Sequence, residues 1–215
     1  MRKRKNNTRH LLVREAARLM YEDGVTQYLD AKRKAAKRIL GRPTKNLPSN
    51  GEISEALHNL AKFHQGDELN STLFEMRLLA MDVMEQLDEF RPRLIGSVST
   101  GRIRKGSDID LHLFSDNLEQ IQLVIEQLDW KYEIKQVLIQ KDGRPVEFNH
   151  IYLELEYPVE LSIYPENEIK IRGRSSTDGK PIERLSVSKV RELILSEHAD
   201  EWREYLRTCV SLETT

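Results

Sequence analysis

Residues 96–110 read Gly-Ser-Val-Ser-Thr-Gly-Arg-Ile-Arg-Lys-Gly-Ser-Asp-Ile-Asp. The stretch begins with a glycine-serine turn and ends with two aspartates separated by one apolar residue. Residues i and i+2 of a strand point to the same face of a sheet, so Asp108 and Asp110 should converge on one spot. Adjacent carboxylates repel each other unless a cation lies between them, and hard oxygen ligands suit magnesium. The stretch therefore predicts a metal site close to a turn.

The turn itself has the features of a phosphate site. Residues 93–95 form a short apolar run that leads directly into Gly96 and Ser97. A glycine leaves backbone N–H groups accessible, and the Ser97 hydroxyl adds a donor for phosphate oxygens. Ser97 could also be the N-cap of a helix, and the two roles are compatible. A metal site beside a phosphate site is what a nucleoside triphosphate requires.

The same stretch resembles the signature of the DNA polymerase beta superfamily of nucleotidyltransferases, which is Gly-Ser, a further glycine, and then Ser-Asp-x-Asp-Leu. The matching positions are Gly96, Ser97, Gly101, Ser107, Asp108, Asp110 and Leu111. One departure is that smaller members often carry a basic residue before the second glycine, whereas here the basic residues follow it, at Arg102, Arg104 and Lys105. The resemblance implies an α+β fold with a polymerase beta-like core, in which helices lie on one side of a mixed sheet.

The resemblance also implies a third carboxylate from a later strand. Glu160 is the candidate, because Val159 and Leu161 should point to the core and Glu160 should face the other way. Glu154 and Glu156 are its rivals on the preceding stretch. Asp108, Asp110 and Glu160 would then hold two magnesium ions, with manganese as an alternative, and Glu160 could also act as general base. The residues expected to contact the nucleotide are Gly96, Ser97, Gly101, Arg102 and Ser107.

Two further features lie near this predicted site. His112 should share the face of the aspartates, where we expect a solvated sheet histidine rather than a ligand. Residues 170–184 include Arg172, Arg174, Lys180 and Arg184 among serines and a glycine. This segment has two interpretations, a loop that closes on the triphosphate or acceptor and a plain polar loop.

Apolar periodicity outlines the rest of the chain. It predicts helices over 10–22, 25–40 and 52–61, and a longer one that begins near Asn70 after a break at Gly66-Asp67. Short strands follow from residue 94, with a hairpin at Asp142-Gly143 and one or two helices over 188–207. We therefore expect a basic helical region at 1–68, the nucleotidyltransferase core at 69–168, and a basic loop with a C-terminal helical segment at 169–215.

Charge is distributed unevenly along the 215 residues. Residues 1–50 hold 14 Lys and Arg against 4 Asp and Glu, although the net charge of the chain is only -1. This asymmetry predicts that the first helices, including Arg33, Lys34, Lys37 and Arg38, meet a polyanion such as RNA; a solvated basic surface is the alternative. The charged first residues and the single Cys209 indicate neither a signal peptide, a membrane span nor a disulfide, so we expect a cytoplasmic protein.

Together these features predict transfer of a nucleoside monophosphate from a nucleoside triphosphate to an acceptor hydroxyl. Two alternatives remain. The first is a non-catalytic nucleotide-binding or RNA-binding regulatory module, which the absence of a third carboxylate would favour. The second is an antitoxin-type nucleotidyltransferase that modifies a partner protein. The sequence identifies neither the base, the acceptor nor the oligomeric state.

Overall fold

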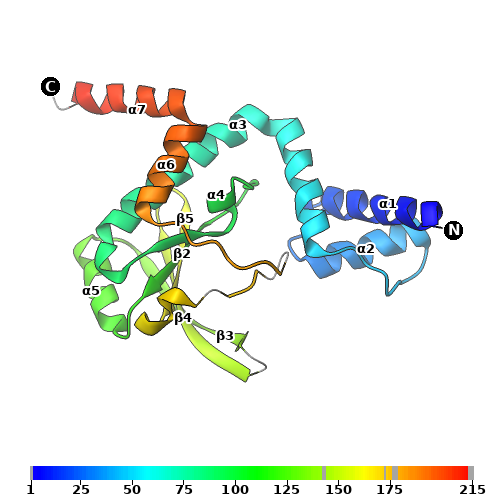
Figure 1. Cartoon of the computed structure of the whole chain (residues 1–215), viewed down its shortest axis with the longest axis horizontal. Helices are drawn as coiled ribbons and strands as arrows, with labels where there is room; N and C mark the ends of the chain where they lie inside the picture. The colour runs from blue at the N-terminus through cyan, green and yellow to red at the C-terminus, as the bar shows by residue number, and fades with distance from the viewer. Residues whose placement is uncertain (1, 142–143, 172, 176–178, 213–215) are drawn as a thin grey trace. The chain divides into compact units, whose positions relative to one another are not determined.

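The computed structural model describes residues 2–141, 144–171, 173–175 and 179–212, so the predicted hairpin at 142–143 and Arg172 lie outside the described residues. The chain divides into two compact units (Figure 1). One comprises Met1–Leu69 with Gly173–Pro181, and the other comprises Asn70–Arg172 with Ile182–Thr215. Within the described ranges, no helix combines the length and the apolar character that crossing a membrane requires.

The first unit is helical. It contains α1 (Arg2–Tyr21), α2 (Tyr28–Leu40) and the first part of α3 (Asn50–Gln86). Alanines at every third or fourth position let α1 and α2 approach closely, and Ala16, Ala31 and Ala35 are fully buried. Gly41 ends α2 in a left-handed conformation with a φ of 67°, which glycine adopts at little cost. The expected helices are therefore present in this region, with α1 starting earlier in the chain than the periodicity indicated.

The span α3 contains the break that the sequence predicts at Gly66-Asp67, displaced by one residue. Residues Asn50–Gln86 are two helices that meet at a kink, where Gln65 has the non-helical angles φ -139° and ψ 29°. Gly66 favours such a kink, because a glycine disfavours helix by about 1 kcal/mol. The second helix begins earlier than the predicted start near Asn70, since residues 66–70 are already helical.

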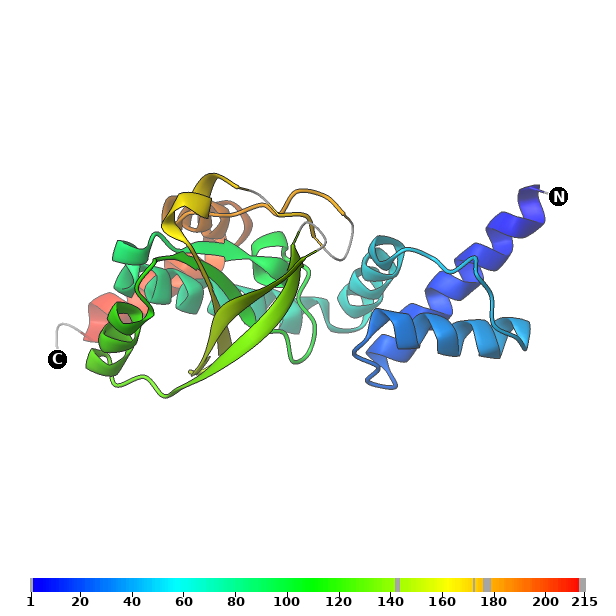
Figure 2. The same ribbon diagram turned by 90° about the horizontal axis from the view of Figure 1, so that it is seen from below.

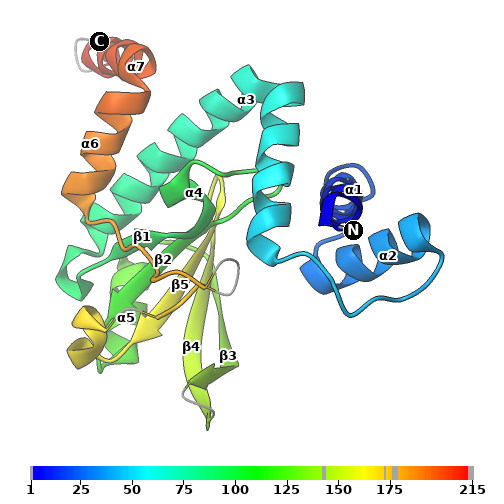
Figure 3. The same ribbon diagram turned by 45° about the vertical axis from the view of Figure 1, so that its right-hand side comes forward.

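The second unit is built around a five-stranded mixed sheet, which confirms the α+β fold class. Its strand order is β1-β2-β5-β4-β3, as Figure 3 shows, and only β2 and β5 are parallel. The strands are β1 (Arg93–Ile95), β2 (Ile109–Phe114), β3 (Tyr132–Lys141), β4 (Arg144–Glu154) and β5 (Pro158–Tyr164). The helices are the second half of α3, α4 (Gly96–Thr100), α5 (Leu118–Gln127), α6 (Val187–Glu197) and α7 (Ala199–Leu212), with short 3-10 turns η1 (Asp88–Phe90) and η2 (Glu166–Lys170). Figure 2 shows the long β3–β4 pair twisting together.

The two faces of this sheet have different compositions. Residues at odd positions of β2 and β5, such as Leu111 and Leu161, are fully buried in an apolar layer. Buried residues of α3 and α5, among them Val83 and Ile121, supply apolar cover of the same kind. The even positions carry polar and aromatic side chains. This arrangement is consistent with a polymerase beta-like core and leaves one sheet face for a site.

Candidate metal centre

Three carboxylates meet on the polar face of the sheet. Asp110 of β2 lies directly opposite Glu160 of β5 in the parallel register, and Asp108 precedes β2 on the same side as Asp110. One ligand oxygen from each residue lies within 4.8 Å of those of the other two. Glu154 and Glu156, the alternative third carboxylates, are exposed and do not belong to this cluster. Parallel pairing of β2 with β5 therefore selects Glu160 from the three glutamates.

Electrostatics at this cluster favour a cation. Burial, followed by the nearby charges of Asp108 and Glu160, raises the pKa of Asp110 to about 7. A carboxylate with such a pKa is costly to ionise in the absence of a positive partner. A divalent ion supplies that partner and binds carboxylate oxygens directly. The three residues thus fit a magnesium or manganese ion in charge, ligand type and spacing.

The turn after β1 lies against the cluster. Ile95, the last residue of β1, pairs with Asp110, so Gly96 follows directly beside the aspartate. Gly96 has a φ of 73°, and a β-carbon there would collide with the Asp110 carboxylate. Ser97 is inside the short helix α4, and Ile95 occupies the N-cap position without a side-chain cap. Ser97 therefore does not take the N-cap role that the sequence left open for it.

The remaining residues of the predicted nucleotide site organise the loop between α4 and β2. Gly101 ends α4 with a φ of 70°, and its N–H group donates to the carbonyl of Ser97, as does the N–H group of Arg102. The Arg102 side chain is exposed. Ser107 closes a turn, because its hydroxyl accepts from the N–H group of Arg104 at 3.0 Å. These three residues fix the conformation of the loop that leads to Asp108 and so help to place Asp108 in the cluster.

A buried arginine anchors α4 from behind. Arg77 of α3 is 1% exposed, and its Nε donates to the carbonyl of Val98 in α4. Its Nη1 donates to Glu197 at 2.8 Å and to Nε2 of His198 at 3.0 Å. Desolvation of His198, assisted by the Arg77 charge, lowers the pKa of this histidine, so it remains a neutral acceptor. Arg77 thereby links the turn helix to α3 and α6.

His150 was not among the residues that the sequence singled out. It lies on β4 and is 7% exposed, with Nδ1 2.6 Å from Oε1 of Glu160. His150 pairs in register with Ser162, which makes Glu160 its diagonal neighbour on β5. Strand alternation places His150 on the polar side of β4, but its contact with Glu160 depends on the β4–β5 register. That register is not visible in the sequence.

His112 is buried, which corrects the expectation of a solvated histidine. It is 3% exposed, and its Nδ1 accepts from Nε of Arg184 at 3.0 Å. Burial and the Arg184 charge lower the pKa of His112 to about 3, so the ring is neutral. Arg184 also donates to three backbone carbonyls of residues 168–171 and lies over the rings of Phe114 and Tyr164. Arg184 therefore forms part of the cover of this sheet face.

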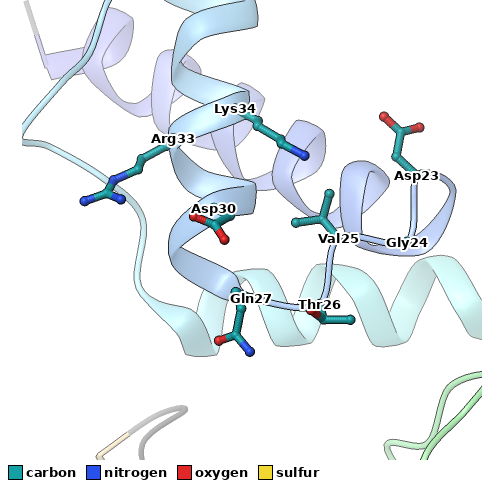
Figure 4. A pocket seen from close by; sticks show the side chains of 8 residues that line it. All are labelled: Asp23, Gly24, Val25, Thr26, Gln27, Asp30, Arg33 and Lys34. Carbon is teal, nitrogen blue, oxygen red and sulfur yellow. The ribbon is translucent and has the colours of Figure 1, made fainter.

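The helical unit carries the second charged feature. The exposed side chains of Arg33, Lys34 and Lys37 lie on α2 and have no ion-pair partner among the described residues, whereas Arg38 pairs with Glu15 and Asp23. A pocket borders this surface at the α1–α2 connection, as Figure 4 shows. Its lining is Asp23, Gly24, Val25, Thr26, Gln27, Asp30, Arg33 and Lys34. Because charges of both signs line the pocket, its chemistry does not select a ligand.

Comparison with known proteins provides little further information. No family model matches the chain, and no curated protein matches it. Among solved structures, the chain is similar to one described as "structure of GLD-2/RNP-8 complex", with 20% sequence identity and a TM-score of 0.30. The similarity covers 57% of this chain and 49% of that chain, so it spans about half the length of its neighbour. This likeness is too weak to assign an activity, and the chemistry of the site has to indicate the function.

Proposed function

We propose that the protein is a nucleotidyltransferase that transfers a nucleoside monophosphate from a nucleoside triphosphate to an acceptor hydroxyl and releases pyrophosphate. The observation that carries this proposal is the convergence of Asp108, Asp110 and Glu160 on one side of the parallel β2–β5 pair. Gly96 adds support, because the backbone reaches the cluster where no other residue would fit. The sequence pattern of residues 96–111 supports the same chemistry.

The three carboxylates would hold magnesium, or manganese in its place. When bound, such an ion neutralises phosphate charge and favours ionisation of an acceptor hydroxyl. The protein side of the reaction then requires two things: the triphosphate must be oriented, and the acceptor proton must leave. For the first task we assign the Ser97 hydroxyl and the backbone of the Gly96 turn, because Gly96 lies against Asp110 and Ser97 follows it, with the exposed Arg102 as a cation on the following loop.

Glu160 is suited to the second task. Its Oε1 is engaged by His150, which leaves Oε2 to receive the proton of the acceptor hydroxyl. The acceptor oxygen forms a bond with the α-phosphorus as the bond to pyrophosphate breaks, and the hydroxyl proton passes to Glu160. General base catalysis of this kind contributes about 10²–10⁴-fold to rate.

The presence of Glu160 in the cluster bears on the alternative functions. A non-catalytic nucleotide-binding module would be favoured by a missing third carboxylate, and Glu160 occupies that position. An enzyme that modifies a partner protein would use the same site and differ only in its acceptor. The unpaired basic side chains of α2 support a nucleic-acid acceptor over a protein acceptor, because phosphates are the natural partners of such a surface.

The test is nucleotide transfer by the purified protein with each labelled triphosphate, magnesium and either total RNA or cell lysate. Wild-type protein should label an acceptor only when the metal is present. Glu160→Gln should lower turnover about a hundredfold or more while retaining triphosphate affinity. Glu156→Gln is the matched control, since this exposed glutamate lies outside the cluster. Normal turnover by Glu160→Gln would overturn the proposed role of Glu160, and no transfer from any triphosphate would overturn the function.

A further inference from the structure

We infer that His150 is a positioning residue that fixes the carboxylate of Glu160 for metal binding. This inference rests on the proposed function, because it assigns Glu160 to the metal centre. The Nδ1 atom of His150 lies 2.6 Å from Oε1 of Glu160. An ionised carboxylate only accepts hydrogen bonds, so Nδ1 carries the proton and donates it. Among the described residues, His150 is the sole hydrogen-bond partner of the Glu160 side chain.

The other ring nitrogen of His150, Nε2, makes a histidine costly in free energy at this position. Nε2 of His150 is buried and has no hydrogen-bond partner in the part of the chain that the structure describes. An unsatisfied buried polar group costs about 1–3 kcal/mol, so an apolar ring at this position would be favoured for packing alone. The ring of Tyr152 is a neighbour of the His150 ring, with the two centroids 6.4 Å apart. The feature that distinguishes histidine here is therefore the Nδ1 donor.

The strand register explains why Glu160 needs a partner. Glu160 lies opposite Asp110 on β5, and a glutamate has one more rotatable bond than an aspartate. Repulsion from the two aspartates would turn a free Glu160 side chain away from the cluster. The hydrogen bond from His150 on β4 holds Oε1 in place. Because the carboxylate group is planar, fixing Oε1 also fixes the direction of Oε2. Residues that orient metal ligands in this way contribute about 10–100-fold to metal affinity or activity.

The experiment compares two substitutions, each of which keeps one feature of histidine and removes another. His150→Asn keeps an N–H donor close to the Nδ1 position but loses the ring, whereas His150→Phe keeps the ring shape but loses the donor. A packing role predicts that Phe substitutes better than Asn, and a positioning role predicts the reverse. Binding of Mn²⁺ to the free protein, followed by electron paramagnetic resonance without nucleotide, measures the effect independently of turnover. Thermal unfolding identifies any variant that fails to fold, and His150→Leu then replaces His150→Phe as the variant without a donor.

We expect His150→Phe to bind Mn²⁺ about 10–100-fold more weakly than wild type and His150→Asn to remain within about threefold of it. Equal affinities of all three proteins, or weaker binding by His150→Asn than by His150→Phe, would overturn the positioning role while the metal centre stood. Absence of Mn²⁺ binding by the wild type would overturn both. A further outcome is that His150→Phe binds Mn²⁺ more weakly than His150→Asn, while the wild type transfers no nucleotide. This outcome would support His150 as a positioning residue and reject the proposed enzyme activity.

Discussion

The backbone of Gly96 lies against the carboxylate of Asp110. A β-carbon at position 96 would collide with Oδ2 of Asp110 and come within 3.1 Å of its Cγ, and the φ of 73° at this glycine is one that other residues adopt with strain. The contact arises because Ile95 pairs with Asp110 and the chain turns immediately afterwards. Gly96 thus serves both the turn and the position of the metal-binding side chain.

Gly96→Ala should displace the Asp110 side chain and weaken Mn²⁺ binding at least tenfold. The substitution adds a collision to the backbone strain that any residue with a β-carbon experiences at positive φ, which costs about 1–2 kcal/mol. Gly41→Ala is the matched control, because its φ is 67° and no atom lies within 4 Å of the added β-carbon. Gly41→Ala should lose stability by the strain alone and bind Mn²⁺ normally. If both variants retain Mn²⁺ affinity, the close approach at Gly96 does not position Asp110.

Alternation along the chain was sufficient to predict the side of the sheet on which each carboxylate lies. Val159 and Leu161 are buried and Glu160 lies between them, facing Asp110, as the pattern indicated. Contacts between strands could not be predicted from the sequence. The register of β4 on β5 and the contact of Arg184 with β2 both join residues that are far apart in the chain. His150 was missed and His112 misjudged for this reason.

The break within α3 could be predicted locally, because Gly66 disfavours helix by about 1 kcal/mol and the backbone leaves helical geometry at the neighbouring Gln65. Arg77 could not be recognised as buried from periodicity, which treats a charged residue as exposed. Its burial depends on acceptors from α4, α6 and the residue that follows α6.

Metal-free protein should become less stable as the pH rises from about 4 to 7. Asp110 titrates near 3.8 as an unperturbed aspartate and near 7 in the fold, so within this range the folded protein binds a proton that the unfolded chain releases. The stabilisation is complete below the lower value and lost above the higher one. Since each pKa unit corresponds to about 1.4 kcal/mol, the dependence is at most about 4 kcal/mol.

Asp110→Asn should remove this dependence, because the amide resembles the protonated acid at every pH. Urea unfolding at pH 5 and pH 8 with a chelator measures the difference between the two proteins. The variant should be more stable than wild type at pH 8, more stable by a smaller margin at pH 5, and inactive in transfer. Parallel pH dependence of the two proteins would show that Asp110 is not the responsible group.

Arg77→Met should destabilise the protein by about 3–5 kcal/mol. Removing this buried, hydrogen-bonded charge leaves acceptors without donors, here the carbonyl of Val98 and Nε2 of His198, and each unsatisfied buried acceptor costs about 1–3 kcal/mol. Arg191→Met is the control, since its ion pair with Glu85 joins side chains that are 53% and 45% exposed and should contribute less than 1 kcal/mol. Thermal or urea unfolding compares the two variants. A loss for Arg77→Met no greater than that for Arg191→Met would contradict an anchoring role.

The triple substitution Arg33→Gln, Lys34→Gln and Lys37→Gln should weaken binding of single-stranded RNA. Each phosphate contact releases counterions, so three lost contacts should reduce the slope of log affinity against log salt by about 2. Stability should change little, because these exposed side chains form no ion pairs among the described residues.

Arg38 is left intact, since it pairs with Glu15 and Asp23 and its loss would confuse binding with folding. The control changes Lys189, Arg203 and Arg207 to Gln, which removes the same charge from residues that are paired with acids one helical turn away. Fluorescence anisotropy with labelled RNA at several potassium chloride concentrations gives affinity and slope together. If the α2 variant and the control bind RNA alike, or wild type binds none, the α2 surface is a solvated basic face and the acceptor has to be sought elsewhere.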